Sequence, residues 1–317
     1  MAQDYILFIH GVDTQGKDHI TPTYADTLIK LIQHSKLTHL SFTPLYWGDL
    51  VKPDEDRVLE LYRASSIWSQ MWFRAFRETT FLRAVGDVGL YLSRCVGAEI
   101  IKQVTQQALQ GIAGYTPEDR LHLVTHSLGT IILFDLLFGS RWANASTLGH
   151  DDVMALRSAI YGLGPDTTTG IRLGSIHTMG SPLGVFSLLN ATTPDCGNQD
   201  EYGTHQSVND IRPQLQQMLS MLETQRKRSL IWRNFVHPGD PIGTPLETII
   251  PHLVQNDDTV LDAKDIVTFG EAFSDYLFAP FSQTSIALLY GGAAHQSYWT
   301  SQKVADVIAQ TIQGERG

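Results

Sequence analysis

Ser127 lies in the sequence at the point where one apolar segment ends and another begins. The residues before it favour a short buried strand, and residues 128–138 favour a helix. In a sharp turn between such a strand and helix, the serine hydroxyl is accessible at the carboxyl edge of the sheet. The first turn of the helix offers backbone N–H groups to a developing oxyanion. This position predicts covalent acyl chemistry, with an ordinary serine cap of helix 128–138 as the alternative.

The sequence around this serine departs from the usual pattern of a nucleophile turn. That pattern is G-x-S-x-G, in which the first glycine lets strand and helix pack closely. Here the residues are T-H-S-L-G, so Thr125 takes the place of the first glycine while Gly129 keeps the second. Because S-x-G alone occurs by chance in many proteins, the prediction needs support from residues elsewhere in the chain.

The predicted strands and helices around Ser127 indicate where partner residues of this serine would lie. Apolar runs bounded by turn residues alternate with segments of helical periodicity, which predicts an α/β fold with a mostly parallel sheet flanked by helices. Sheets of this kind place their sites at the carboxyl ends of the strands. The predicted strands are 5–9, 40–47, the segment before Ser127, 172–179, 230–236 and part of 259–268; the predicted helices are 23–35, 128–138, 151–160, 210–227 and 298–313.

Residues that directly follow these strands can therefore meet in space. His10 and Gly11 follow the first strand, and Asp240 follows strand 230–236 in a turn-rich segment. His295 precedes the closing helix. Each of these residues alone has an ordinary explanation as a turn or surface residue, but a serine, an acid and a histidine at the ends of successive elements form the set that activates a serine hydroxyl.

Other residues compete for the roles of base and acid. His237 and His252 are alternative bases, although His237 adjoins the proposed acid in sequence and His252 precedes the last strand. His126 adjoins the serine, so we expect it to pack or to line the pocket. The alternative acids, which crowd a segment of loop and strand, are Asp257, Asp258, Asp262 and Asp265.

Two histidines, His122 and His126, share one face of the predicted strand and could suggest a metal site. No third ligand lies nearby in the sequence, and a tetrahedral metal site needs three or four protein ligands. The cysteines Cys95 and Cys196 are too few for a disulfide framework and show no C-x-x-C spacing. We therefore expect no metal, no cofactor and a reducing compartment.

Residues 53–114 differ in composition from the rest of the chain. They carry many aromatic residues among arginines and show no strand pattern, which predicts a helical cap inserted before the serine-bearing strand. Packing against the main domain is the simpler explanation of these aromatic residues. The sharper explanation is a lid over an acyl chain, formed by Trp68, Trp72, Phe73 or Phe76. An amphipathic helix of this kind can also contact a membrane surface.

The overall composition is that of a folded protein, with 43% hydrophobic and 18% charged residues. A chain of 317 residues with this pattern of elements fits one domain with an insertion at 53–114. The formal net charge of -10 disfavours nucleic acid as a partner. No basic and apolar leader precedes the first strand and no apolar run reaches about 18 residues, so we expect a cytoplasmic protein without a membrane span.

The chain resembles the α/β-hydrolase superfamily, and in particular its lipase- and esterase-like branch, in which the catalytic triad follows the order serine, acid, histidine. The similarity covers residues 5–47 and 115–313 and leaves the helical insertion outside. It implies that Ser127 is the nucleophile, Asp240 the acid and His295 the base.

The resemblance also implies an oxyanion hole. Its backbone N–H groups would belong to Leu128, which follows the nucleophile, and to Val12, which follows His10 and Gly11. The turn at 180–184, with the sequence G-S-P-L-G, is similar to a turn that is frequent after the next strand in lipase-like members.

These residues lead us to expect a serine hydrolase that cleaves carboxylic esters, with lipid-like acyl esters or thioesters as candidate substrates. Two alternatives keep the fold: a catalytically inactive binding or scaffold protein, and an acyltransferase that uses an acceptor other than water. The expected partner is a small-molecule or lipid-like ester. Membrane-surface contact has no further support in the sequence, and the sequence leaves the oligomeric state open.

Overall fold

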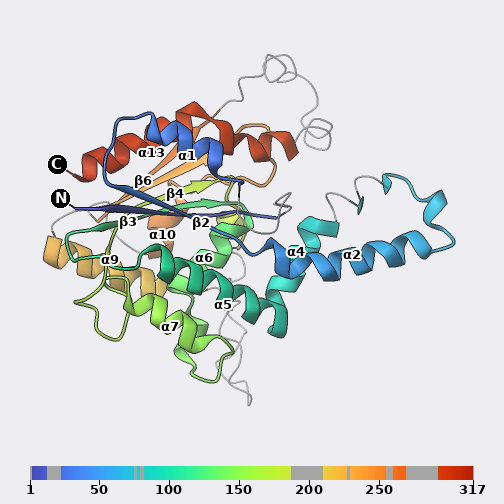
Figure 1. Cartoon of the computed structure of the whole chain (residues 1–317), viewed down its shortest axis with the longest axis horizontal. Coiled ribbons are helices and arrows are strands. Elements are labelled where there is room, and N and C mark those ends of the chain that lie inside the picture. The colour runs from blue at the N-terminus through green and yellow to red at the C-terminus, as the bar shows by residue number, and fades with distance from the viewer. Residues whose placement is uncertain are drawn as a thin grey trace.

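A sheet of six parallel strands forms the centre of the molecule in the computed structural model (Figure 1). The structure describes residues 2–12, 23–74, 77–78, 82–186, 210–226, 229–254, 260–268 and 292–316. In these residues the strand order is β2-β1-β3-β4-β5-β6, and every neighbouring pair is parallel. The strands are β1 (Asp4–Ile9), β2 (Leu40–Leu45), β3 (Arg120–His126), β4 (Arg172–Met179), β5 (Leu230–Val236) and β6 (Leu261–Val267).

Helices cover both faces of this sheet, which confirms the expected fold class. In Figure 1, α1 (Asp26–Gln33) and α13 (Gln302–Glu315) lie on one face. The opposite face carries α5 (Arg94–Gly111), α6 (Leu128–Phe138), α7 (His150–Ser158) and α9 (Arg212–Arg226). The remaining elements are α2 (Gly48–Ala64), η1 (Trp68–Gln70), α4 (Leu82–Leu92), η3 (Ser140–Ala143), α8 (Leu183–Phe186), α10 (Ile249–Val254) and η5 (Ser297–Thr300).

Two apolar cores result from this layering. Alternate side chains of a strand point to opposite faces, so Ile6 and Phe8 pack toward α1 and α13 while Leu7 and Ile9 pack on the other side. Strands buried on both faces have continuous apolar sequences, which is why β1 has no polar alternation beyond its first residue. Helix α6 is buried at all its positions, so it shows no amphipathic stripe.

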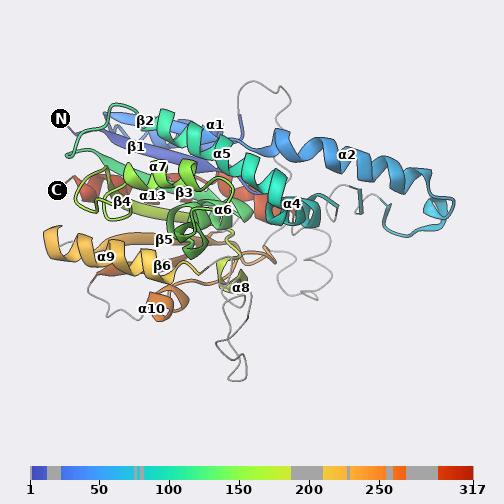
Figure 2. The ribbon, with the colours of Figure 1, turned by 90° about the horizontal axis from the view of Figure 1, so that it is seen from below.

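The predicted insertion at 53–114 contains helices with different surroundings. Helix α5 packs on the sheet through buried Ile100, Val104 and Ala108, so the simpler explanation of the apolar residues holds for this helix. Helix α2 instead projects away from the sheet in both views (Figures 1 and 2). It begins at Gly48 and continues through Pro53, so the proline does not mark the start of the helix. The division of the chain into one domain and an insertion stays a prediction.

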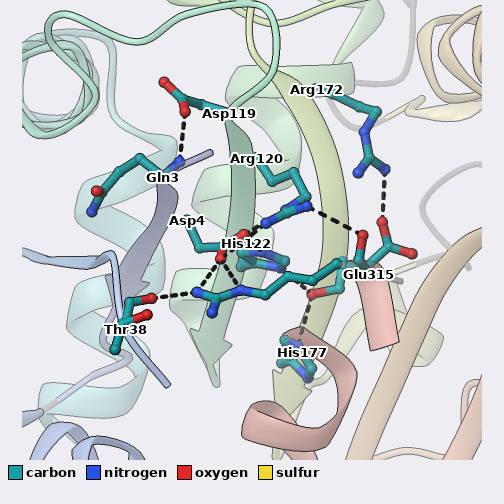
Figure 3. A network of polar contacts seen from close by, with 11 residues as sticks. Gln3, Asp4, Thr38, Asp119, Arg120, His122, Arg172, His177 and Glu315 are labelled. Atoms are coloured by element: carbon teal, nitrogen blue, oxygen red, sulfur yellow. Dashed lines mark hydrogen bonds and ion pairs between the residues drawn. The ribbon is translucent and has the colours of Figure 1, made fainter. Parts of the chain in front are cut away.

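A buried polar network joins the amino ends of the strands to the end of α13 (Figure 3). The carboxylate of Asp4 accepts hydrogen bonds from Arg120 at 2.6 Å and from Arg316 at 2.8 Å. His122 bridges Asp4, at 3.2 Å, and Ser175, at 2.7 Å. Both ring nitrogens of His122 thus have protein partners, at the end of β3 opposite to Ser127. Burial alone would raise the pKa of the Asp4 carboxyl, but hydrogen bonds from His122, Arg120 and Arg316 keep it far below its usual range.

Within the described residues, no helix is both long and apolar enough to cross a membrane. Several residues named in the sequence analysis lie outside the described residues: Cys196, Asp257, Asp258 and Phe76.

Candidate active site

The turn that carries Ser127 is held in an uncommon backbone conformation. Ser127 has φ 53° and ψ -131°, a region that residues with a side chain rarely occupy. The backbone around it is fixed on both sides, because its N–H donates to the Met179 carbonyl and its own carbonyl accepts from Thr130, each at 3.0 Å. Such strain persists only where the surrounding structure imposes it, and it is typical of a nucleophile turn between strand and helix.

Two glycines allow the serine turn to lie against the segment after β1. A Cβ atom on Gly11 would lie 2.9 Å from Ser127 Oγ and closer still to its Cβ. A Cβ atom on Gly129 would lie 3.0 Å from the carbonyl oxygen of Ile9 and would collide with that of His10. Glycine at 129 is therefore required by the close approach of α6 to the end of β1.

Thr125, which replaces the first glycine of the usual pattern, is accommodated by a partner on α6. Its hydroxyl forms a 2.8 Å hydrogen bond with that of Thr130, and both residues are fully buried. A threonine at position 125 is thus satisfied in the interface between strand and helix. Thr125 in place of the first glycine of G-x-S-x-G therefore leaves the turn between β3 and α6 intact.

His10 fixes the segment next to the serine turn. Its Nδ1–H donates to the Gly11 carbonyl at 2.6 Å, and its Nε2 accepts from the Trp47 backbone N–H at 3.3 Å. The Trp47 ring lies parallel to the imidazole, at 5.0 Å between centroids, and its Nε1–H donates to the His10 carbonyl. Burial lowers the pKa of His10 to about 4, so this histidine is neutral near pH 7 and holds the loop in place.

The structure brings Asp240 and His295 together, although they are 55 positions apart in the chain. His295 Nδ1 lies 2.9 Å from Asp240 Oδ2, and the two side chains are 6% and 0% exposed. The Ile242 N–H donates to the other oxygen, Oδ1, at 2.9 Å. Burial raises the pKa of the Asp240 carboxyl, but His295 and the other donors outweigh it, so the net pKa is below the ordinary value. Asp240 is therefore ionised near pH 7.

Tyr298 also contacts Asp240, and the sequence did not reveal this contact. Its hydroxyl donates to Asp240 Oδ2 at 2.8 Å and accepts from the His237 N–H at the same distance. Burial, together with the nearby carboxylate, raises the pKa of Tyr298 above its usual range, so the phenol keeps its proton. The only signal in the sequence is its spacing of three residues from His295, which one helical turn brings to the same side.

The G-S-P-L-G turn after β4 needs glycine at its first position, Gly180. Its φ is +54°, and a Cβ atom there would lie 2.6 Å from Asp240 Oδ2 and 2.9 Å from His295 Nδ1. The following residue, Ser181, offers its carbonyl to the N–H and hydroxyl of Thr244, at 3.0 and 2.9 Å. This turn therefore leaves room for the acid and histidine and ties down the loop that carries Asp240.

His126 connects the serine turn to His295. Its Nε2–H donates to the His295 backbone carbonyl at 2.6 Å, and the two ring centroids are 4.5 Å apart. Burial, with repulsion from His295, lowers the pKa of His126 to about 3, so the ring is neutral near pH 7. Among the described residues, the buried Nε2 of His295 has no hydrogen-bond partner. That nitrogen is the atom that a base would use.

The competing residues have other partners where the structure describes them. His237 Nδ1 accepts from the Gly239 N–H at 3.0 Å. Asp262 forms an ion pair with Arg233 at 2.6 Å, and Asp265 accepts a hydrogen bond from the backbone N–H of Leu246. The side chain of His252 is outside the described set, as are Asp257 and Asp258.

The proposed lid residues Trp72 and Phe73 are exposed to solvent. Trp72 and Phe73 are 79% and 74% exposed, so they form no buried wall beside Ser127. Trp68 packs on Tyr62 of α2, at 5.4 Å between ring centroids.

Comparison with known proteins adds structural resemblances only. No family profile matches the chain, and no curated protein matches it. A truncated carbohydrate esterase from gut microbiota aligns over 100% of this chain and 87% of its own, at 9% identity and a TM-score of 0.42. ClbQ from the colibactin NRPS/PKS pathway aligns over 99% of each chain, at 10% identity and a TM-score of 0.37. Dienelactone hydrolase from Anabaena variabilis aligns over 92% of this chain and 85% of its own, at 11% identity and a TM-score of 0.30.

Similarities at these scores carry no functional argument. The assignment of the fold rests on the molecule itself: six parallel strands in the order given above, helices on both faces, and a strained serine between β3 and α6. This arrangement is the α/β-hydrolase type of fold.

Proposed function

We propose that the protein is a serine hydrolase that cleaves carboxylic esters through a covalent acyl-enzyme. One observation carries the proposal: the buried Asp240–His295 pair leaves Nε2 of the histidine without a partner in the described structure, and His126 links that histidine to the strained Ser127 turn. An unassisted serine hydroxyl is a poor nucleophile near pH 7, and a neutral imidazole held by a carboxylate is the group that activates it.

The first half of the reaction transfers the acyl group to the enzyme. Ser127 Oγ attacks the ester carbonyl carbon while His295 Nε2 takes the hydroxyl proton, and Asp240 stabilises the imidazolium through Nδ1–H. The carbonyl oxygen becomes an oxyanion, which would accept from the N–H groups of Leu128 and Val12, each worth roughly 3 to 4 kcal/mol in comparable sites. His295 then gives its proton to the departing alcohol as the C–O bond breaks.

The second half returns the enzyme to its starting state. A water molecule attacks the acyl carbon with His295 as base, and the serine oxygen leaves with the returned proton. Tyr298 acts through Asp240, because its hydrogen bond keeps the carboxylate oriented toward Nδ1. We assign the substrate class as carboxylic esters; thioesters and lipid-like acyl esters react by the same steps.

Labelling with a fluorophosphonate probe tests this proposal, because only an activated serine is phosphonylated at a useful rate. We expect the intact protein to be labelled and the Ser127→Ala variant to be unlabelled and inactive toward short nitrophenyl esters. Ser158→Ala is the matched control, since this serine lies at the end of α7 and its hydroxyl donates to the Met154 carbonyl of the same helix. An unlabelled intact protein would mean an inactive scaffold, and labelling that persists in Ser127→Ala would mean another nucleophile.

A further inference from the structure

The end of the α2 arm carries a group of exposed apolar side chains. We call residues 61–74 with 77–78 the arm tip. Leu61, Ile67, Trp72 and Phe73 are 62%, 56%, 79% and 74% exposed. They are four of the seven large hydrophobic residues that are strongly exposed in the described structure. Clustered exposure of this kind marks an interaction site more often than scattered single residues do.

The arm tip also differs in charge from the rest of the protein. It contains three arginines, Arg63, Arg74 and Arg77, against one acidic residue, Glu78, and the exposed Glu60 of α2 directly precedes it, in a chain with a net charge of -10. Arg63 and Glu78 form an ion pair at the surface. Arg77 donates from Nε to the Trp72 carbonyl at 3.1 Å, which holds its guanidinium beside the residue with the exposed ring. The tip thus presents excess positive charge together with aromatic side chains.

The length of α2 separates this tip from the acidic body. The helix has 17 residues, which corresponds to about 25 Å at 1.5 Å per residue. At physiological ionic strength the screening length is about 8 Å, so charges on the body have little effect at the tip. Figures 1 and 2 both show the tip as the part of the described chain that lies farthest from the sheet.

We propose that the arm tip docks on the surface of a membrane that contains anionic lipids. Trp72 and Phe73 enter the headgroup region, where an aromatic side chain with exposed apolar area is most favourable, and Arg74 and Arg77 lie at the level of the lipid phosphates. Charge favours this occupant over a tip-to-tip dimer, because two copies of the tip would bring two arginine-rich surfaces together. The described surface outside the arm offers no matching cluster of large exposed apolar side chains.

Docking of this kind would orient the candidate active site. Helix α2 begins directly after Trp47, whose ring stacks on His10 beside the serine turn. The arm therefore starts at the same edge of the sheet as Ser127. The binding proposal is independent of the proposed function, because it concerns exposed side chains that have no part in the triad.

Vesicle flotation tests the proposal with the full chain. We expect the protein to float with vesicles of phosphatidylcholine plus phosphatidylserine and to bind vesicles of phosphatidylcholine alone much more weakly. Since each arginine near an anionic surface strengthens binding about fivefold, Arg74→Gln with Arg77→Gln should weaken binding to the anionic vesicles about thirtyfold. Trp72→Ser with Phe73→Ser should weaken it more than roughly tenfold, because the apolar area is lost.

Control variants separate lipid docking from misfolding and from self-association. Leu148→Ser removes a strongly exposed apolar side chain, 53% exposed, outside the arm, and should leave binding unchanged. Far-UV circular dichroism should be the same for all variants, because none of the altered side chains is buried. Failure of the intact protein to float with anionic vesicles would overturn the proposal, as would binding that is unaffected by the double variants. A concentration-dependent dimer in sedimentation that the Trp72→Ser, Phe73→Ser variant abolishes, without vesicle binding, would instead identify a second copy as the occupant.

Discussion

His126 should add to the sensitivity of the folded protein to mild acid, and the variant His126→Gln should remove that part of it. Its imidazole is fully buried and donates to the His295 carbonyl from Nε2. An unfolded histidine has a pKa near 6.5, whereas the folded value is about 3. Because the folded pKa is the lower one, the stabilising contribution is fully present above pH 6.5 and is lost progressively as the pH falls toward 3.

The size of the effect follows from the two pKa values. Between pH 6.5 and 5 the unfolded chain takes up the proton and the folded chain does not, so the free energy of unfolding falls by about 1.4 kcal/mol per pH unit, or about 2 kcal/mol in total. The glutamine amide can keep the donor to the His295 carbonyl but does not titrate. His10, whose pKa is about 4, contributes a similar loss that is present in both proteins and cancels in the comparison.

Urea unfolding at about pH 7.5 and about pH 5, with the free energy extrapolated to water, measures this difference. The intact protein should lose about 2 kcal/mol more than His126→Gln between the two conditions. If both proteins lost the same free energy, within about 0.5 kcal/mol, then His126 would not be a buried neutral imidazole and its assigned position next to His295 would be wrong.

Three further substitutions test the geometry of the site. Asp240→Asn should lower turnover on a nitrophenyl ester about ten-thousandfold while the protein stays folded by circular dichroism; near-normal turnover would exclude Asp240 as the acid. Tyr298→Phe should lower turnover about tenfold with little change in KM and reduce the free energy of unfolding by about 1 kcal/mol, as measured in urea; an unchanged turnover would make Tyr298 purely structural. Gly11→Ala should slow fluorophosphonate labelling of Ser127 strongly, about a hundredfold, whereas Gly89→Ala, which has open space around it, should label normally; equal rates would refute the close approach.

The sequence was sufficient for the fold class and for the strands that carry the site. Continuous apolar runs such as the one in β1 are buried on both faces, and this pattern is typical of a parallel sheet. The separation of Asp240 from His295 in the chain did not prevent the prediction that they meet, because Asp240 follows β5 and His295 precedes the closing helix at the same edge of the sheet. Their chemical roles stay predictions until the substitutions above are measured.

Other features depend on surroundings that a sequence does not contain. Trp47 and Trp72 are the same residue type, yet Trp47 is fully buried against His10 and Trp72 lies beyond the end of a projecting helix. Tyr298 acquires its role only because the Asp240 loop folds over it. The composition of the sequence changes near Pro53, but α2 begins at Gly48 and contains this proline within its first two turns, although proline disfavours a helix interior.

The polar network at the amino ends of the strands has a consequence for biosynthesis. Asp4 is completely buried, and one of its two arginine partners, Arg316, follows it by 312 positions. On the ribosome the first strand is therefore made long before the cation that completes its surroundings. The sheet therefore reaches its final stability only once Arg316 has been made and has joined Asp4.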